Sequence, residues 1–322
     1  MRPLAQVAQV AQADTAQRSG DAPAGAGAND KLPRIVYVMG AARSGTTIVE
    51  IMLASAPQVF GAGELTFLNA DAFLRDQPCS CGQPASRCEV WSRVLARCGW
   101  SRADVERFAE LRGHVDAHRQ FWKVALFWGS SRAHAAYAEM SAALVQAVAE
   151  VTGASVIIDS SKYAGRALAL ARALPGRVQV LWMRRTTRAI IAAFQKQNTD
   201  EQYPKGAWTA ALYCLYVQLC ARWVELRLGT AVRRLDYEAL QADPVAEMGA
   251  LEPWSGLDLA RARAILAAHG AFDPGHIVTG NRVRRARAVT FQRADESANV
   301  RASLSVRMAA GVADFLGRVL GL

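Results

Sequence analysis

Long hydrophobic runs are missing from this sequence of 322 residues. A helix that crosses a membrane needs about 18 or more apolar residues in succession, and no stretch reaches that length. Residues 1–31 are rich in Ala, Gln, Gly and Asp and lack the apolar core of a signal peptide. We therefore predict no transmembrane segment, a disordered tail over residues 1–31 and a cytoplasmic protein.

The usual signatures of nucleic-acid binding are also missing, although the chain is basic. Its 38 Lys and Arg residues outnumber 28 Asp and Glu residues, and the net charge is +10. Such an excess suits an anionic partner, which can be a nucleic acid, a membrane surface or a small anion. Because there is no zinc finger, no basic region joined to heptads and no RNP sequence, nucleic acid is not the expected partner.

The remaining composition is that of a globular protein, with 52% hydrophobic and 20% charged residues. A chain of this length can bury a large core, either as one α/β domain with insertions or as two domains. We predict one domain over residues 32–322, with an inserted helical region rich in Cys and Trp at about residues 70–140.

The most informative stretch runs from Ile35 to Glu64. Residues 35–39 form a short apolar run rich in β-branched side chains, which predicts a buried strand. A loop containing glycine follows at residues 40–47, and an apolar helical face then continues until Pro57. A strand, a glycine loop and a helix in this order point backbone N–H groups and the positive end of a helix at an anion.

This loop lacks the lysine of a nucleotide P-loop, whose pattern is G-x-x-x-x-G-K-[ST]. Gly40 and Gly45 occupy the glycine positions and Thr47 the hydroxyl position, but Thr46 stands in place of the lysine. A cation appears at Arg43 instead. The loop therefore suits a phosphate that carries one more small anionic group better than a triphosphate with magnesium. A tight turn before a buried helix is the purely structural interpretation.

Two further apolar runs, at residues 156–158 and 178–183, predict buried strands with polar residues at their carboxyl ends. In an open parallel sheet this edge holds the ligand. Asp159 follows the first run, where an ATPase would place its magnesium-binding acid, although a simple helix cap is the alternative. Arg185 and Arg188 follow the second run and open a helix, which indicates an anion site.

The segment Arg-Ser-Gly-Thr-Thr at residues 43–47 resembles the 5'-phosphosulfate loop of sulfotransferases that use PAPS (3'-phosphoadenosine 5'-phosphosulfate). The similarity is to the branch with Arg in the loop, which includes the protein-tyrosine sulfotransferases and many bacterial enzymes. An acidic residue after the first helix is the base in that branch, and Glu64 stands at that place. The loop residues to which the resemblance assigns cofactor binding are Arg43, Ser44, Gly45, Thr46 and Thr47.

Later segments extend the resemblance. The sequence Asp-Ser-Ser-Lys that ends at Lys162 is similar to a bacterial motif, and Lys162 would face the sulfuryl group or its bridging oxygen. Arg185 and Arg188 match the 3'-phosphate element R-D-P-R-A-x-x-x-S, although two threonines replace Asp-Pro. Ala193 stands where the family has a phosphate-binding serine, so the resemblance does not say what replaces that hydroxyl.

Two C-terminal runs complete the five motifs, which together span about residues 34–293. Residues 237–244 resemble the family's Y-E-x-L-x-x-D-P run, which we interpret as structural. Residues 276–284 resemble H-x-x-x-G-N-P-x-R, a loop that folds over the nucleotide, and Arg284 would reach the 3'-phosphate. Without the resemblance, the five arginines within residues 282–293 predict only a solvated basic loop.

The resemblance implies an α/β protein, with a three-layer P-loop-like fold, a parallel central sheet and helical insertions. The implied reaction is in-line transfer of the sulfuryl group of PAPS to a hydroxyl of a small-molecule, lipid or sugar acceptor, with Glu64 as general base. Arg43 and Lys162 would neutralise charge on the sulfuryl and bridging oxygens, and no metal would be required.

Two other functions fit parts of the sequence. One is a divergent P-loop kinase or NTPase that binds Mg-ATP through Asp159, which the missing lysine disfavours. The other is a non-catalytic nucleotide- or zinc-binding protein built on the cysteines.

Four of the six cysteines lie close together in the sequence. A C-x-C pair with two later cysteines can bind zinc, but the spacing is not that of a standard two-knuckle site. A reduced structural cluster or a single disulfide bridge is the other interpretation. Similar bacterial sulfotransferases often carry a C-x-C-G…C-x-x-W run here, so the cysteines also support the family. These residues are Cys79, Cys81, Cys88 and Cys98.

Aromatic residues are concentrated between residues 91 and 128, where four of the eight tryptophans fall. Either they pack in the core or they line an acceptor pocket with apolar or stacking surface. His114 and His118 are four residues apart on a predicted helix, and His118 is a second choice for the general base. The aromatic content favours a hydrophobic alcohol, a phenol or a sugar as acceptor, whereas the oligomeric state is not specified.

Overall fold

The computed structural model describes residues 32–128, 131–195, 205–280, 282–292 and 303–322. The chain divides into two units, Met1–Leu32 and Pro33–Leu322, and the account below concerns the second. The tail predicted over residues 1–31 lies outside the described residues.

Five parallel strands form the central sheet, in the order β2-β3-β1-β4-β5. The central strand β1 pairs with β3 and β4, so that Ile35 aligns with Ile157 on one side and Val178 on the other. Both faces of a parallel sheet are covered by helices, which explains why the inner strands are continuous apolar runs. The strands are β1 Arg34–Gly40, β2 Val59–Gly61, β3 Val156–Lys162, β4 Val178–Arg184 and β5 Val232–Asp236.

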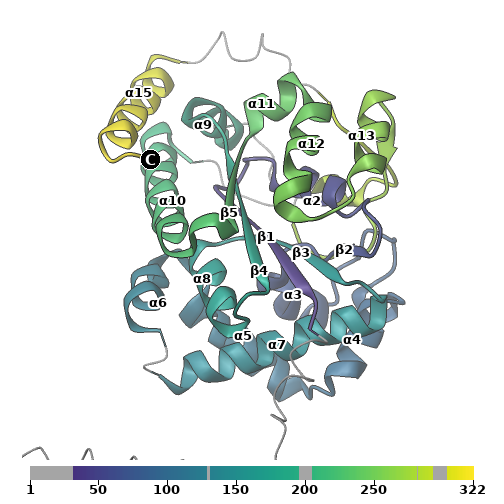
Figure 1. Cartoon of the computed structure of the whole chain (residues 1–322). Coiled ribbons are helices and arrows are strands. Elements are labelled where there is room, and N and C mark those ends of the chain that lie inside the picture. The colour runs from purple at the N-terminus through teal and green to yellow at the C-terminus, as the bar shows by residue number, and fades with distance from the viewer. Residues whose placement is uncertain (1–31, 129–130, 196–204, 281, 293–302) are drawn as a thin grey trace, which may run out of the picture. The chain divides into compact units, whose positions relative to one another are not determined.

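Helices cover both faces of this sheet, which confirms the predicted three-layer α/β fold (Figure 1). On one face, Val36 and Val38 belong to the core that α2, α12 and α13 complete. On the other face, Tyr37 points toward α8 and donates its hydroxyl hydrogen to the Tyr163 carbonyl. The helices on the two faces are α2 Thr46–Leu53, α11 Tyr237–Ala242, α12 Pro244–Ser255 and α13 Ala260–Ala267 on the first, and α7 Arg132–Thr152, α8 Ala164–Ala173 and α10 Ala207–Leu228 on the second.

A helical region separates β2 from β3, where the sequence predicts an insertion. Its helix α5 begins at a capping box, in which Ser101 and Asp104 satisfy each other's backbone N–H groups. The elements before α7 are α3 Leu65–Leu68, the π-helix η1 Asn69–Leu74, η2 Ala85–Arg87, α4 Trp91–Cys98, α5 Arg102–Val115, η3 His118–Gln120 and α6 Phe121–Phe127.

The C-terminal part of the chain adds a helix to the side of the sheet that carries α10. Helix α15 packs on α9 and α10 around Ile191, Val217 and Val306. Within the described residues, no helix has both the length and the apolar content needed to span a membrane. The remaining elements are α9 Thr187–Gln195, η4 Gly229–Ala231, the antiparallel pair β6 Ala271–Phe272 and β7 Val289–Thr290, η5 Arg282–Arg285 and α15 Leu304–Val319.

Candidate functional site

The loop between β1 and α2 depends on two glycines. A Cβ atom on Gly40 would lie 2.6 Å from the Met183 carbonyl oxygen, so only glycine permits this approach of β1 to β4. Gly45 has φ +92°, and a Cβ atom there would lie 2.4 Å from the ring of Tyr237. The glycine spacing noted in the sequence therefore reflects close packing at two places around the loop.

The hydroxyl groups of this loop are buried at the start of α2. Ser44, Thr46 and Thr47 are all buried, and the Ser44 hydroxyl donates to the Ala41 carbonyl at 2.7 Å. The N-cap residue of α2 is Gly45, which has no side-chain oxygen to accept hydrogen bonds from the amides of the first turn. Uncapped amides at the positive end of a helix form the usual protein site for a phosphate group.

Arg185, the residue after β4, lies against the same loop. Its Nη1 atom donates to the Arg43 carbonyl at 2.7 Å, and its guanidinium carbon stands 4.6 Å from the centre of the Tyr237 ring. Among the described residues, no hydrogen-bond partner faces its buried Nε atom. The fold thus brings an arginine with an unused donor to the loop between β1 and α2, from 142 residues further along the chain.

Glu64 and Lys162 form an ion pair beside the loop. Backbone hydrogen bonds continue from β2 to the end of β3, where Ser160 N–H donates to the Gly63 carbonyl at 2.9 Å. This pairing sets Glu64, the next residue, beside Lys162, and the Lys162 ammonium donates to Glu64 Oε1. The Glu64 side chain is only 9% exposed, so water screens this pair weakly.

The loop that follows His276 closes over Glu64. The Thr279 hydroxyl accepts from Glu64 N–H at 3.0 Å and donates to the Glu64 carbonyl at 2.8 Å. At Gly280, which has φ +118°, a Cβ atom would lie 3.3 Å from Glu64 Oε1 and 3.8 Å from Thr47 Oγ1. The Glu64 carboxylate and the Thr47 hydroxyl therefore flank the same point, so the carboxylate lies beside the loop between β1 and α2.

Glu50 is a buried acid that the sequence reasoning missed. It is fully buried in α2, where its carboxylate accepts from Gly63 N–H and, at 2.6 Å, from the Ser160 hydroxyl. Burial raises the pKa of Glu50 from its ordinary value of 4.5 to about 8, despite these two donors. An acidic residue inside the apolar run at residues 48–53 was the available signal. Glu50 ties α2 to the segment that carries Glu64.

Asp159 is turned away from the loop. Its carboxylate pairs with the buried Arg166 at 2.8 Å and accepts from Ser161 N–H at 3.0 Å. Arg166 also donates to the Tyr137 hydroxyl at 2.6 Å, so the acid belongs to a buried structural network. An Asp159 engaged in this way is not available to hold magnesium at the loop, and the kinase interpretation is not favoured.

Arg284 is buried, and its guanidinium contacts two backbone carbonyl oxygens. Its Nη1 atom donates to the Pro78 carbonyl at 3.0 Å and contacts the Ile277 carbonyl at 3.4 Å. The side chain thus supports the segment before Cys79 and the loop over Glu64. Its contact with a 3'-phosphate stays a prediction.

Aromatic side chains surround His118 near the Glu64–Lys162 pair. Tyr163, which follows Lys162, has its ring centre 4.6 Å from that of His118 and 6.1 Å from that of Phe67. Tyr213 stands 5.6 Å from His118 and accepts a hydrogen bond from the loop at Ala42 N–H. Burial, with Lys205 nearby, lowers the pKa of His118 to about 4.

The tryptophans of residues 91–128 contact aromatic side chains of several elements instead. Trp91 is fully buried with Phe60 at 5.9 Å, and Trp122 lies 5.4 Å from Trp223 between ring centres. These contacts fit the core-packing interpretation of the tryptophans. The rings near Lys162 are those of Tyr and Phe, whose positions no local pattern singled out.

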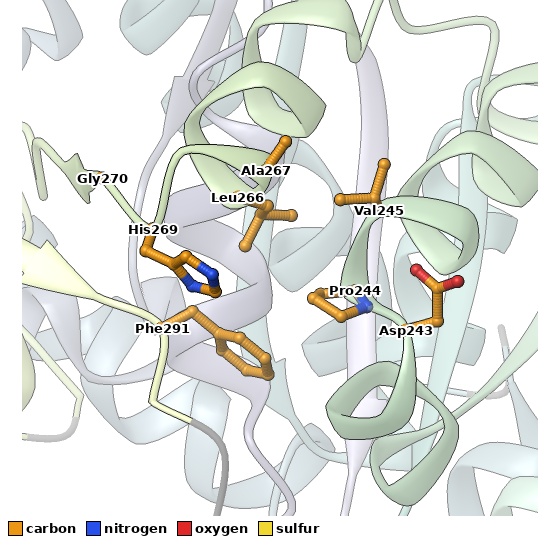
Figure 2. Close-up of a pocket in the computed structure, with 8 residues that line it drawn as sticks. All are labelled: Asp243, Pro244, Val245, Leu266, Ala267, His269, Gly270 and Phe291. Atoms are coloured by element: carbon orange, nitrogen blue, oxygen red, sulfur yellow. The ribbon is translucent and has the colours of Figure 1, made fainter.

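The structure has a separate cavity of about 150 Å³ (Figure 2). It lies where the start of α12 approaches the end of α13 and Phe291, and none of the predicted site residues lines it. Its lining residues are Asp243, Pro244, Val245, Leu266, Ala267, His269, Gly270 and Phe291.

With this geometry established, similarity to known proteins identifies the class. The chain belongs to the sulfotransferase family, whose model matches residues 33–261. The protein is therefore an enzyme of the sulfotransferase class, and the family implies PAPS as co-substrate. None of the curated proteins matches the chain.

Solved structures of bacterial sulfotransferases are similar to the chain at low identity. Sulfotransferase STF9 from Mycobacterium avium is 15% identical, over 74% of this chain and 69% of its own, with a TM-score of 0.43. The sulfotransferase domain of the Synechococcus PCC 7002 olefin synthase is 16% identical, over 87% and 94%, with a TM-score of 0.44. The sulfotransferase domain from the curacin biosynthetic pathway is 15% identical, over 88% and 98%, with a TM-score of 0.45.

Proposed function

We propose that this enzyme transfers the sulfuryl group of PAPS to the hydroxyl of a small-molecule, lipid or sugar acceptor. The observation that carries the proposal is the buried Glu64–Lys162 pair beside Thr47 and the first turn of α2. An acid, a cation and a phosphate loop at one point are the groups that such a transfer needs.

The nucleotide binds to the loop through its 5'-phosphosulfate. The amides of Ser44, Gly45, Thr46 and Thr47 and the cation of Arg43 are the proposed contacts, supported by the uncapped start of α2. Arg185 binds the 3'-phosphate, and its unused buried Nε donor supports this role. Arg284 is the second proposed contact of the 3'-phosphate, and it also holds the covering loop through the Pro78 and Ile277 carbonyls.

In the reaction, the Glu64 carboxylate accepts the proton of the acceptor hydroxyl as its oxygen attacks sulfur. A new O–S bond forms while the bond from sulfur to the 5'-phosphate oxygen breaks, and PAP (3',5'-adenosine bisphosphate) leaves with the bonding electrons. The Lys162 ammonium moves its hydrogen bond from Glu64 to the bridging oxygen and neutralises the negative charge that develops on that oxygen. The ion pair thus holds both groups in place until the donor binds.

The acceptor lies beside the aromatic rings near Lys162. Tyr163, Phe67 and Tyr213 offer apolar faces next to the Glu64–Lys162 pair. Such faces bind a hydrophobic alcohol, a phenol or a sugar ring by stacking and burial.

Calorimetric titration of the full chain with PAP, ADP and Mg-ATP tests the donor. We expect PAP to bind most tightly and without added metal, and Arg185→Ala to weaken PAP binding by about tenfold to a hundredfold through loss of a charge-assisted contact. Arg261→Ala, at an exposed arginine of α13, is the control and should bind as the wild type. A preference for Mg-ATP over PAP would overturn the proposal.

A further inference from the structure

We propose that Cys79, Cys81, Cys88 and His276 bind one Zn²⁺ ion. A sulfur or nitrogen atom of each residue lies within 4.8 Å of the others, although His276 is almost 200 residues further along the chain. The fourth cysteine of the sequence cluster, Cys98, is not part of this group. All six cysteines lie within the described residues and are free of disulfide bonds.

The spacing of these atoms is that of a tetrahedral zinc site. Zn–S and Zn–N bonds of about 2.3 and 2.0–2.1 Å place neighbouring ligand atoms about 3.8 Å apart for two sulfurs and about 3.6 Å for sulfur and nitrogen. The Cys79 and Cys88 sulfurs are 3.7 Å apart. The distances from His276 Nδ1 are 3.3 Å to Cys88 and 4.0 Å to Cys79. Shifts of a few tenths of an ångström bring these three atoms to zinc distances, and the Cys81 sulfur, within 4.8 Å of the others, needs a shift of at most about 1 Å.

A tight turn presents the first two cysteines together. Gly82 has φ +86°, and its N–H donates to the Cys79 carbonyl at 2.9 Å. Cys79 N–H in turn donates to the Gln83 carbonyl at 2.8 Å. This closed turn, centred on a left-handed glycine, explains why a short C-x-C spacing suffices for both thiols. Cys88 directly follows η2, and its sulfur lies 3.7 Å from that of Cys79.

The fourth ligand is oriented by its own neighbours. His276 directs Nδ1 toward the thiols, while Nε2 stands 3.4 Å from the Glu89 carboxylate. The Trp91 indole donates to the His276 carbonyl at 2.6 Å and holds its backbone. A carboxylate on the second ring nitrogen is the usual outer partner of a metal-binding histidine, because it selects the tautomer that leaves the other nitrogen free for the metal.

Three thiolates and one imidazole select zinc among the common metals and leave no coordination position open. Such a closed set is typical of a structural site rather than of a catalytic one. Cys79 and Cys88 are buried whereas Cys81 is exposed, so the ion would sit at the surface of the helical region.

The ion would join the cysteine turn to the loop over Glu64. Two hydrogen bonds already connect them, from Ser80 N–H to the Ile277 carbonyl at 2.9 Å and from Ile277 N–H to the Ser80 hydroxyl at 2.7 Å. Thr279, which holds the Glu64 backbone, follows two residues later. This consequence for Glu64 rests on the proposed function, whereas the metal site itself does not.

Elemental analysis of the purified full chain tests the site directly. We expect about one zinc per chain in the wild type, loss of the zinc in Cys88→Ser and in His276→Ala, and full retention in Cys98→Ser. Because the buried Cys88 variant can fail to fold, Cys81→Ser, at the exposed ligand, provides a second measurement, with a several-fold loss of zinc during dialysis against a chelator.

The wild type supplies a readout that needs no variant. Co²⁺ substituted for zinc in the wild type should show a strong thiolate-to-cobalt charge-transfer band. Wild-type protein without zinc, zinc content unchanged in both Cys81→Ser and Cys88→Ser, or iron in place of zinc would each overturn the proposal. PAP titration of the same samples separates the two proposals. A protein that contains zinc but does not bind PAP would contradict the proposed function and leave the zinc site intact.

Discussion

Glu64 occupies an environment in which a carboxylate can work as a base. It is buried, its backbone is held by Thr279, and its side chain forms an ion pair with Lys162. Glu64 and Lys162 lie 98 residues apart in the sequence. At the scale of single residues, the proposed chemistry therefore depends on this carboxylate more than on any other group.

We expect Glu64→Gln to reduce turnover by at least about a hundredfold, since general-base catalysis contributes about 10²–10⁴ in rate. Binding of PAP should change little, because the amide keeps the shape of the side chain. Steady-state rates with PAPS and a phenolic or alcohol acceptor, together with PAP calorimetry, give both quantities. Glu110→Gln, at an exposed position of α5, is the matched control. A variant that loses PAP binding and turnover together would assign Glu64 a structural role.

The buried Glu50 makes stability depend on pH. The folded chain holds a proton on this carboxyl up to a pKa of about 8, whereas the unfolded chain releases it near 4.5. Unfolding between these values releases a proton, so the contribution of Glu50 lowers the free energy of unfolding as pH rises, by up to about 1.4 kcal/mol per pH unit. Below about pH 4.5 and above about pH 8 the contribution no longer changes.

Glu50→Gln should remove this part of the pH dependence. The amide oxygen still accepts from Gly63 N–H, and the Ser160 hydroxyl can accept from the amide nitrogen. Urea unfolding at about pH 5.5, 6.5 and 7.5 measures the slope, with Glu110→Gln as the control that should keep it. An unchanged slope in Glu50→Gln would show that the folded carboxyl is not protonated in this range.

At the scale of elements, the loop between β1 and α2 is shaped by partners outside it. Tyr237, the first residue of α11, fills the space beside Gly45. Arg185 stacks on the same ring, with its guanidinium carbon 4.6 Å from the ring centre. The run that begins at Tyr237 was interpreted from the sequence as structural. Because Tyr237 packs against the loop, the structural role of this run is to shape the site.

We expect Gly45→Ala to destabilise the protein by more than a typical glycine substitution at positive φ. The left-handed backbone alone costs about 1–2 kcal/mol for alanine, and contact with the Tyr237 ring adds about 1–3 kcal/mol. Gly99→Ala, at the end of α4 with φ +65° and nothing within 4 Å, carries only the backbone cost. Urea unfolding of both variants measures the difference, and equal losses would mean that the ring moves aside freely.

At the scale of the whole molecule, the proposed zinc ion links the helical region to the C-terminal loop over the sheet edge. Its ligands come from two segments, 79–88 and residue 276, between which lie β3, β4 and β5. A cross-link of this kind stabilises the folded state because the unfolded chain does not present the ligands together.

Removal of the metal should therefore lower the thermal midpoint by several degrees, since one kcal/mol corresponds to roughly 2–4 °C for domains of about 150–250 residues. Calorimetric scans at one fixed rate, with and without a chelator, measure the shift, and added zinc should restore the midpoint. Cys98→Ser should respond as the wild type does. An equal midpoint after complete removal of zinc would contradict a stabilising role.

Much of the fold followed from local sequence. The apolar runs that became β1, β3 and β4 and the glycine loop depend on neighbouring residues, and their patterns predicted them. The loop sequence also indicated an anion site and the sulfotransferase family, because a phosphate loop is built from a few consecutive residues.

The tertiary structure decided which distant groups meet. It paired Glu64 with Lys162, turned Asp159 toward Arg166, directed Arg284 to the Pro78 and Ile277 carbonyls, and replaced Cys98 by His276 in the thiol cluster. Each of these contacts joins residues whose separation in space is set by the strand order, which places β3 beside β1 and returns the C-terminal loop to the sheet edge. Local spacing carries no information on such contacts, because they form only when the strands assemble.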